Sequence, residues 1–173
     1  RHIRLPELLY REVLEVDERL AADGSVVTPL DEAGAEAGLR AAFGRGLRAV
    51  AIVLMHAYAH PVHERRLAAL ARAIGFTQVS VSHEVSPLIR FVARGDTTVV
   101  DAYLSPVLRR YVARVAAAMP GVRLQFMQSN GGLTDAAAFQ GKDSILSGPA
   151  GGIVGMARVS EAAGFRQVIG FDM

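Results

Sequence analysis

The first part of the chain alternates hydrophobic and polar residues in a pattern typical of a β-hairpin. Residues 12–31 alternate on either side of the Asp23-Gly24 pair, which is a strong turn signal. The second arm leads to Asp31, a residue type that often caps helices. We therefore expect a hairpin followed by a helix over residues 32–43.

A strand, a helix and a second strand are predicted next. The apolar run 49–58, interrupted only by His56, is typical of a strand covered on both faces, and residues 78–85 alternate as another strand. Between them, Pro61 can open a helix whose apolar stripe ends before Gly75. Strands connected in this way form a βαβ unit, so we expect them to be parallel.

One long helix is predicted in the middle of the chain. Apolar residues from Val99 to Val115 recur at helical spacing and cover one wide face. Pro106 lies inside this stretch, where a proline either kinks the helix or allows Ser105 to cap a second one. We expect the kink, because the apolar stripe keeps its phase across Pro106.

The last part of the chain places glycine-rich loops between strands and a helix. A strand over residues 122–128 leads into a loop at 129–132, and in open parallel sheets such loops line the ligand crevice. A helix that opens at Gly148-Pro149 precedes a strand over residues 167–171. This alternation predicts an α/β fold, with a mainly parallel or mixed sheet and flanking helices.

The start of the last helix is a candidate phosphate site. Gly148, Gly151 and Gly152 expose backbone N–H groups at the positive end of a helix dipole. Asp172, which ends the following strand, suits a divalent cation that accompanies phosphates. A packing role is the alternative, because Gly151 and Gly155 are four residues apart and would let the helix press against a strand.

Composition describes an ordinary α/β chain and removes several kinds of chemistry. The 173 residues are 51% hydrophobic and 21% charged, which allows one domain or two small ones. The absence of cysteine excludes disulfides, thiol nucleophiles and cysteine zinc sites. The net charge of only +2, with scattered arginines, argues against nucleic-acid binding.

The expected location is the cytoplasm, without membrane attachment. The longest apolar run, residues 49–59, is too short to cross a bilayer, and no secretory leader opens the chain. The chain begins at Arg1 rather than at a methionine and ends inside a motif. We therefore expect a segment of a longer protein.

Several motifs resemble those of one enzyme family. LSGPAGG at residues 146–152, a helix, and GFDM at residues 170–173 closely resemble the hydantoinase A / 5-oxoprolinase family. MQSNGG at residues 127–132 is also similar to that family. So are TTVVDAYLSPV and, near the start of the chain, EVDER and TPLDE. Asp96 and Asp101 depart from the family pattern, so no side-chain role is carried over to either position.

The resemblance implies part of an actin-like (ribonuclease-H-like) ATPase domain. It divides the chain into an N-terminal-type region, residues 1–85, with the hairpin and the βαβ unit, and the start of the hydantoinase A core region, residues 86–173. Members of the family continue after this Asp-Met pair with a glycine-rich phosphate loop. That loop is not in this sequence, so the fragment alone is expected to be inactive.

The implied function is that of an ATP-dependent hydrolase. It would open a cyclic amide, such as a hydantoin, N-methylhydantoin or 5-oxoproline, through a phosphorylated intermediate. ATP and Mg²⁺ would be its cofactors, and a companion B-type subunit or domain its partner. One alternative is a subunit of an ATP-dependent ketone carboxylase of the acetone type. Another is a non-catalytic actin-like module that binds a nucleotide and a protein partner.

The site residues follow from the same motifs, although no catalytic residue can be assigned. Five residues are expected close to the nucleotide: Gly148, Pro149, Ala150, Gly151 and Gly152. Four are candidates for lining the substrate: Ser129, Asn130, Gly131 and Gly132. Asp172 is the candidate metal ligand. A plain turn is the alternative at Asn130, because Asn-Gly is a strong turn dipeptide.

Three histidines invite a metal interpretation. His56, His60 and His63 are close in sequence, but a strand end, a loop and a helix would have to converge, and only Glu64 accompanies them. We therefore favour capping or solvated histidines at these positions.

Overall fold

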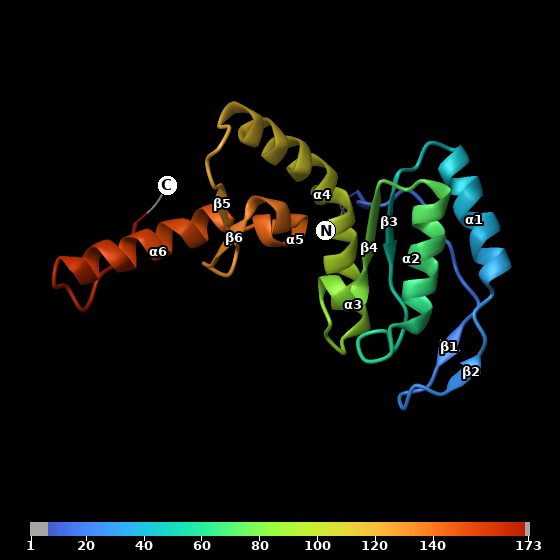
Figure 1. Ribbon diagram of the computed structural model, residues 1–173. Helices are drawn as coiled ribbons and strands as arrows, with labels where there is room; N and C mark the ends of the chain where they lie inside the picture. The colour runs from blue at the N-terminus through green and yellow to red at the C-terminus, as the bar shows by residue number, and fades with distance from the viewer. Residues whose placement is uncertain (1–6, 172–173) are drawn as a thin grey trace, which may run out of the picture. The chain divides into compact units, whose positions relative to one another are not determined.

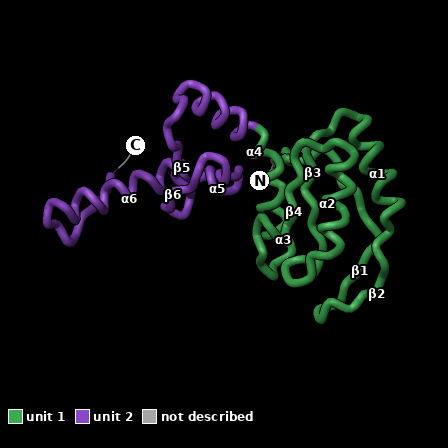
Figure 2. Tube along the Cα trace, viewed as in Figure 1, with its two compact units in different colours: residues 1–106 green, residues 107–173 purple. Residues whose placement is uncertain are grey.

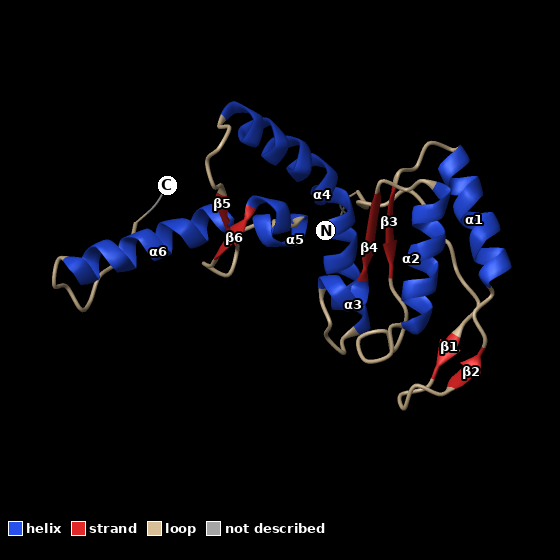
Figure 3. Cartoon of the chain, viewed as in Figure 1, coloured by secondary structure: helices blue, strands red, loops and turns tan. Residues whose placement is uncertain are grey.

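The computed structural model describes residues 7–171 and contains two compact units, residues 1–106 and 107–173 (Figure 2). Helices and strands alternate along both units (Figure 3), so the α/β fold class predicted from the sequence is confirmed. Within residues 7–171, no helix has the length and apolar character that crossing a membrane requires.

The predicted βαβ unit is the centre of the first unit. β3 (Ala49–Ile52) and β4 (Gln78–Val81) are parallel, with Ala49 opposite Gln78 and Ile52 opposite Val81. α2 (Val62–Ile74) connects the strands, and α1 (Glu32–Gly44) packs beside α2 (Figure 1). The parallel pair and its crossover helix are thus confirmed.

The hairpin predicted near the start of the chain is also present. β1 (Arg19–Leu20) and β2 (Val26–Thr28) pair antiparallel and are shorter than predicted. In the turn, Asp23 Oδ1 accepts hydrogen bonds from Ser25 Oγ at 2.7 Å and Ser25 N at 3.0 Å, which hold the pKa of Asp23 below its usual value. Asp31 caps α1 as expected, because its Oδ1 accepts from Gly34 N at 3.0 Å.

The two faces of β4 differ in chemistry. Val79 and Val81 pack into the hydrophobic core between the strands and helices α1 and α2. Gln78 and Ser80 face the opposite way, because side chains alternate along a strand. Ser80 Oγ donates to Asp101 Oδ2 at 2.7 Å. The strand pair therefore presents an apolar face to α1 and α2 and a polar face to the helix that carries Asp101.

That helix, α4 (Phe91–Ala118), continues through Pro106, which confirms one helix rather than two, while the kink stays a prediction. Its buried face is not the apolar stripe seen in the sequence, since Tyr103 in that stripe is 54% exposed. Five residues of α4 are buried instead: Arg94, Thr98, Asp101, Ala102 and Ser105. The polar face of β4 explains this choice, because Asp101 accepts hydrogen bonds from the hydroxyls of Ser80 and Ser105.

Both strands end earlier than the sequence predicts. β3 stops at Ile52 rather than near residue 58, and β4 stops at Val81, where α3 (Ser82–Val85) begins. The backbone beyond each strand bonds to side chains of the core. Leu54 N donates to Glu64 Oε1 at 2.9 Å, and the Leu54 carbonyl accepts from Arg94. Hydrophobic periodicity carries no information about such side-chain partners.

Gly75 ends α2 in the left-handed conformation, with φ at 116°. A Cβ at this position would lie 3.1 Å from Cζ of Phe43. We expect Gly75→Ala to lower the free energy of unfolding by about 1–2 kcal/mol in urea titrations, because an L-residue is strained at this φ. Gly44→Ala is the matched control, since no atom lies within 4 Å of its Cβ position. Equal losses in both variants would rule out backbone strain as the cause.

The second unit contains an antiparallel hairpin and helices. β5 (Gln125–Met127) pairs antiparallel with β6 (Leu133–Asp135). A 3₁₀ turn (Ala136–Ala138), α5 (Gly141–Ser144) and α6 (Ser147–Ala162) follow (Figure 1). The prediction that the strand before residue 129 belongs to a parallel sheet is therefore wrong, because the Asn-Gly turn returns the chain directly alongside it.

The strand predicted over residues 167–171 is not formed. Ile169 and Phe171 are 97% and 89% exposed, so no described strand pairs with this segment. An apolar run can resemble a strand in sequence, but a strand also needs a neighbour for its backbone hydrogen bonds. Asp172, predicted to end this strand, lies outside the described residues.

Candidate functional site

The two glycine-rich motifs, distant in sequence, are in contact within the second unit. The loop of residues 129–132 joins β5 to β6, and Ser129 fixes it to the chain that enters α6. Ser129 N and Ser129 Oγ both donate to the carbonyl oxygen of Asp143, each at 2.7 Å. Leu146 N donates to Ser129 Oγ at 3.0 Å. One serine therefore positions both motifs.

The loop itself is a tight turn. Gln128 N donates to the Gly132 carbonyl at 2.8 Å, and Gly131 has a φ of 82°, which favours glycine. Asn130 Oδ1 accepts from Gly132 N at 2.8 Å. Asn130 thus has the turn-forming role that was the alternative interpretation. A substrate-lining role for residues 129–132 stays a prediction.

Removing the Ser129 hydroxyl should loosen the entry to α6. We expect Ser129→Ala to speed hydrogen exchange of the Leu146 amide about tenfold, because hydrogen bonds of this kind contribute about 0.5–1.5 kcal/mol each. The Ala163 amide, which donates to Val159 O at 3.0 Å at the far end of α6, should be unchanged. Equal acceleration at both amides would mean that the whole helix is destabilised and that Ser129 has no local effect.

The first turn of α6 fits the sequence prediction in its backbone. Pro149 lies in this turn, and the cap residue Leu146 has no side-chain capping bond. A Cβ at Gly151 would lie 3.6 Å from Met127 Cγ, so the packing interpretation holds for Gly151. The packing interpretation does not hold for Gly148 or Gly155, because no atom lies within 4 Å of a Cβ placed at either position. Gly148 instead borders a cavity.

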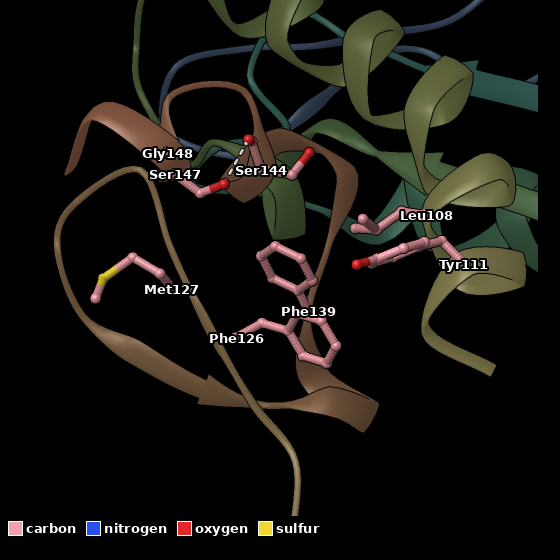
Figure 4. A pocket seen from close by; sticks show the side chains of 8 residues that line it. All are labelled: Leu108, Tyr111, Phe126, Met127, Phe139, Ser144, Ser147 and Gly148. Atoms are coloured by element: carbon pink, nitrogen blue, oxygen red, sulfur yellow. Dashed lines mark hydrogen bonds between the residues drawn. The ribbon is translucent and has the colours of Figure 1, made fainter. Parts of the chain in front are cut away.

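That cavity has a volume of about 460 Å³ and lies within the second unit (Figure 4). Its walls come from α4, β5, the 129–146 region and the first turn of α6. They are formed by Leu108, Tyr111, Phe126, Met127, Phe139, Ser144, Ser147 and Gly148. Of the residues predicted to contact nucleotide or substrate, Gly148 alone is among those that line it.

Aromatic rings dominate the cavity. Phe126 and Phe139 are stacked, with ring centroids 5.2 Å apart and planes 12° apart. Tyr111 meets Phe126 edge-on, with centroids 6.5 Å apart. Figure 4 shows these rings beside Met127, with Ser144, Ser147 and Gly148 at another edge of the space. The sequence did not single out Tyr111, Phe126 or Phe139, because an aromatic residue at an apolar position usually indicates core packing.

A second cluster, missed from the sequence, lies in the first unit. Glu64 is fully buried and accepts hydrogen bonds from Ser82 Oγ at 2.6 Å and His83 Nδ1 at 2.7 Å. Arg94 is also fully buried and donates to Ser82 Oγ at 2.9 Å and to the Met55 carbonyl at 2.9 Å. Burial lowers the pKa of Arg94 below its usual value, and Glu64 opposes that change. The cluster fixes the chain beyond β3 and β4.

The structure gives two of the three clustered histidines a role that neither sequence interpretation foresaw. His63 Nδ1 lies 2.7 Å from Glu18 Oε2, and both side chains are almost fully buried. His60 Nε2 lies 3.1 Å from the Ala22 carbonyl. Both contacts join the β1–β2 hairpin and its flanks to the segment at the start of α2. Among the described residues, no three His, Asp or Glu side chains are grouped to hold a metal ion.

Solved structures define the class of fold. The chain matches the ATP-dependent caprolactamase from Pseudomonas jessenii with a TM-score of 0.80 and 36% identity, over 91% of this chain and 24% of that one. It matches nucleotide-free acetone carboxylase with a TM-score of 0.75 and 25% identity, over 86% and 22%. The chain therefore has the α/β fold of a part of these enzymes, which is consistent with an actin-like ATPase-type domain.

Sequence comparison gives the family. The model of the hydantoinase/oxoprolinase N-terminal region matches residues 1–75, and that of hydantoinase/oxoprolinase matches residues 94–173. The 5-oxoprolinase of Saccharomyces cerevisiae is 41% identical over 152 residues, which is 86% of this chain and 12% of that protein. Caprolactamase subunit alpha of Pseudomonas jessenii is 36% identical over 99% of this chain and 25% of its own length. The chain belongs to the hydantoinase/oxoprolinase family, and it spans a quarter or less of these two relatives.

Proposed function

We propose that the chain is part of an ATP-dependent enzyme that opens a cyclic amide. Relatives named 5-oxoprolinase and caprolactamase support this reaction class. The structural observation that carries the proposal is the contact through Ser129, which holds the 129–132 loop against the entry to α6, close to the cavity. This arrangement places backbone N–H groups of a helix start next to an apolar space that can receive a ring.

The proposed reaction uses ATP to activate a poor electrophile. The amide carbonyl oxygen of the substrate attacks the γ-phosphorus of ATP, and ADP leaves. Water then adds to the carbonyl carbon, the C–N bond breaks and the nitrogen takes up a proton, which leaves an acyl phosphate. A second water hydrolyses the acyl phosphate to the carboxylate and releases inorganic phosphate. Cyclic amide, ATP and two water molecules thus give the open-chain product, ADP and phosphate. Electrostatic stabilisation of the transferring phosphoryl group is the main task of a protein in such a step.

Within this reaction we assign residues 148–152 to the neighbourhood of the nucleotide phosphates and residues 129–132 to that of the substrate. The first-turn N–H groups of α6 suit an anion. A single carboxylate together with phosphate oxygens is a usual set of Mg²⁺ ligands, and Asp172 would supply that carboxylate. The sequence pattern supports the Asp172 assignment, since this residue lies outside the described part of the chain.

The wider organisation of the protein is also a proposal. We propose a division into regions 1–85 and 86–173, and the family models, which match residues 1–75 and 94–173, support it. The name of caprolactamase subunit alpha supports a companion subunit or domain of the B type. We propose that the protein acts in the cytoplasm.

The second candidate is an ATP-dependent ketone carboxylase, which the similarity to acetone carboxylase favours. ADP formation by the full-length protein separates the candidates when 5-oxoproline, hydantoin, ε-caprolactam, or acetone with bicarbonate is added. We expect a cyclic amide to stimulate ADP formation and to yield a ring-opened product. Stimulation by acetone with bicarbonate alone would identify a carboxylase. Nucleotide binding without turnover on any compound would identify a non-catalytic module.

A further inference from the structure

Among the residues that the structure describes, none that lines the cavity of the second unit carries a charge. The eight residues that line its volume of about 460 Å³ are leucine, methionine, aromatic, serine and glycine residues. A carboxylate placed there would find no side chain of opposite charge among the described lining residues, whereas an uncharged ligand needs none. The cavity therefore suits an uncharged ligand, and its size lies in the range of small-molecule sites.

The polar atoms of the cavity are hydroxyl groups with defined directions. Ser144 Oγ donates its proton to the Gly141 carbonyl at 2.8 Å, and Ser147 Oγ donates to the Ser144 carbonyl at 2.9 Å. A hydroxyl has one proton and two lone pairs, so both serines offer acceptors to a ligand. Figure 4 shows Tyr111 directed toward the rings of the cavity. Its hydroxyl can donate as well as accept.

These features match the two parts of a lactam. An apolar ring can pack on the stacked Phe126 and Phe139, while the amide offers an N–H donor and a C=O acceptor on neighbouring atoms. We propose that this cavity is the substrate pocket and that it selects an uncharged cyclic amide over one that carries a carboxylate, such as 5-oxoproline. This inference rests on the proposed function and narrows its substrate class.

A positively charged side chain placed in the pocket tests the proposed preference for an uncharged cyclic amide. In the full-length protein we expect kcat/KM for ATP-dependent opening of ε-caprolactam to exceed that for 5-oxoproline by at least about tenfold. Leu108→Arg should move this ratio toward 5-oxoproline by at least about tenfold, because the guanidinium can pair with the carboxylate. Val107→Arg is the matched control, since Val107 neighbours Leu108 on α4, is 54% exposed and does not line the cavity. It should leave the ratio unchanged.

A second variant and a binding measurement complete the test. If Leu108→Arg does not fold, Tyr111→Arg can replace it, because Tyr111 is a half-exposed lining residue. Tyr111→Arg should shift the ratio of the two kcat/KM values in the same direction. Saturation-transfer NMR without ATP should detect ε-caprolactam on the wild-type protein and a weaker signal on Leu108→Arg.

Several outcomes would overturn the inference. A wild-type preference for 5-oxoproline would overturn it. An equal change of the kcat/KM ratio in Leu108→Arg and in the Val107→Arg control would also overturn it. So would displacement of ε-caprolactam by adenosine, which would assign the pocket to a nucleobase. In each case the ring-opening activity itself would stand. If no cyclic amide stimulates ADP formation, the proposed function fails, and lactam binding by NMR then shows whether the pocket assignment fails with it.

Discussion

Replacing Glu64 with leucine should lower the free energy of unfolding by about 3–5 kcal/mol, the range for leaving a buried charge uncompensated. Glu64 and Arg94 are both fully buried and are bridged by Ser82, so the variant leaves the Arg94 cation without an anion. It also removes the acceptor of the Leu54 and His83 backbone N–H groups. Guanidinium titrations followed by circular dichroism would measure the loss.

A matched substitution and a double variant test the cause. Glu36→Leu replaces an exposed glutamate whose partner is Arg40, and the expected change is about 0.3–0.5 kcal/mol. The double variant Glu64→Leu, Arg94→Met removes both charges and should be more stable than Glu64→Leu alone. If the double variant is less stable than the single one, lost hydrogen bonds explain the effect and an unpaired charge does not.

Replacing Asp172 with asparagine should reduce ATP-dependent turnover of the full-length protein by at least ~100-fold. The substitution keeps the size of the side chain and removes its charge, and a loss on this scale is about 3 kcal/mol of transition-state stabilisation. Folding should change little. Steady-state rates across a magnesium titration would measure the effect, because weakened metal binding also raises the Mg²⁺ concentration required for half-maximal rate.

The control for this experiment is Asp96→Asn, which makes the same chemical change at an exposed position on α4. Its turnover should remain close to that of the wild type. Near-normal turnover of Asp172→Asn at all magnesium concentrations would exclude the metal role and leave Asp172 as a residue that caps a turn.

The sequence predicted correctly those structural features that a few neighbouring residues determine. The Asp23-Gly24 turn, the Asp31 cap and the end of α2 at Gly75 each depend on a few neighbouring residues, and all three are present. The βαβ unit followed from hydrophobic periodicity, since the strands and the helix between them bury apolar faces.

Elements that depend on distant partners were predicted less well. The strand expected to continue to residue 85 gives way to α3 because Glu64, on another element, accepts hydrogen bonds from Ser82 and His83. The buried face of α4 is polar because β4 presents Ser80 to Asp101, which no helical pattern reveals.

In the candidate site, too, the sequence predicted the local features and missed the contacts between distant residues. The sequence identified the two glycine-rich motifs, because glycine and proline at fixed positions reflect local backbone needs. It did not show that Ser129 joins them, since that contact spans 14 residues to Asp143 and 17 to Leu146. The aromatic walls were also missed, because their residues come from α4, β5 and the segment after β6.

The Glu64–Arg94 cluster also bears on how the first unit folds. Arg94 bonds to the Leu54 carbonyl across 40 residues, and Glu64 bonds to Leu54 and His83 across 10 and 19 residues. Closing such loops costs chain entropy before any contact compensates for it, so contacts of this separation slow folding. Neither strand end can reach its native hydrogen bonding until the segments that carry Leu54, Glu64, His83 and Arg94 have met. The cluster therefore couples these segments into one cooperative step, and an intermediate with β3 and β4 paired but α4 undocked would lack the hydrogen bonds of Arg94 to Ser82 and to the Leu54 carbonyl.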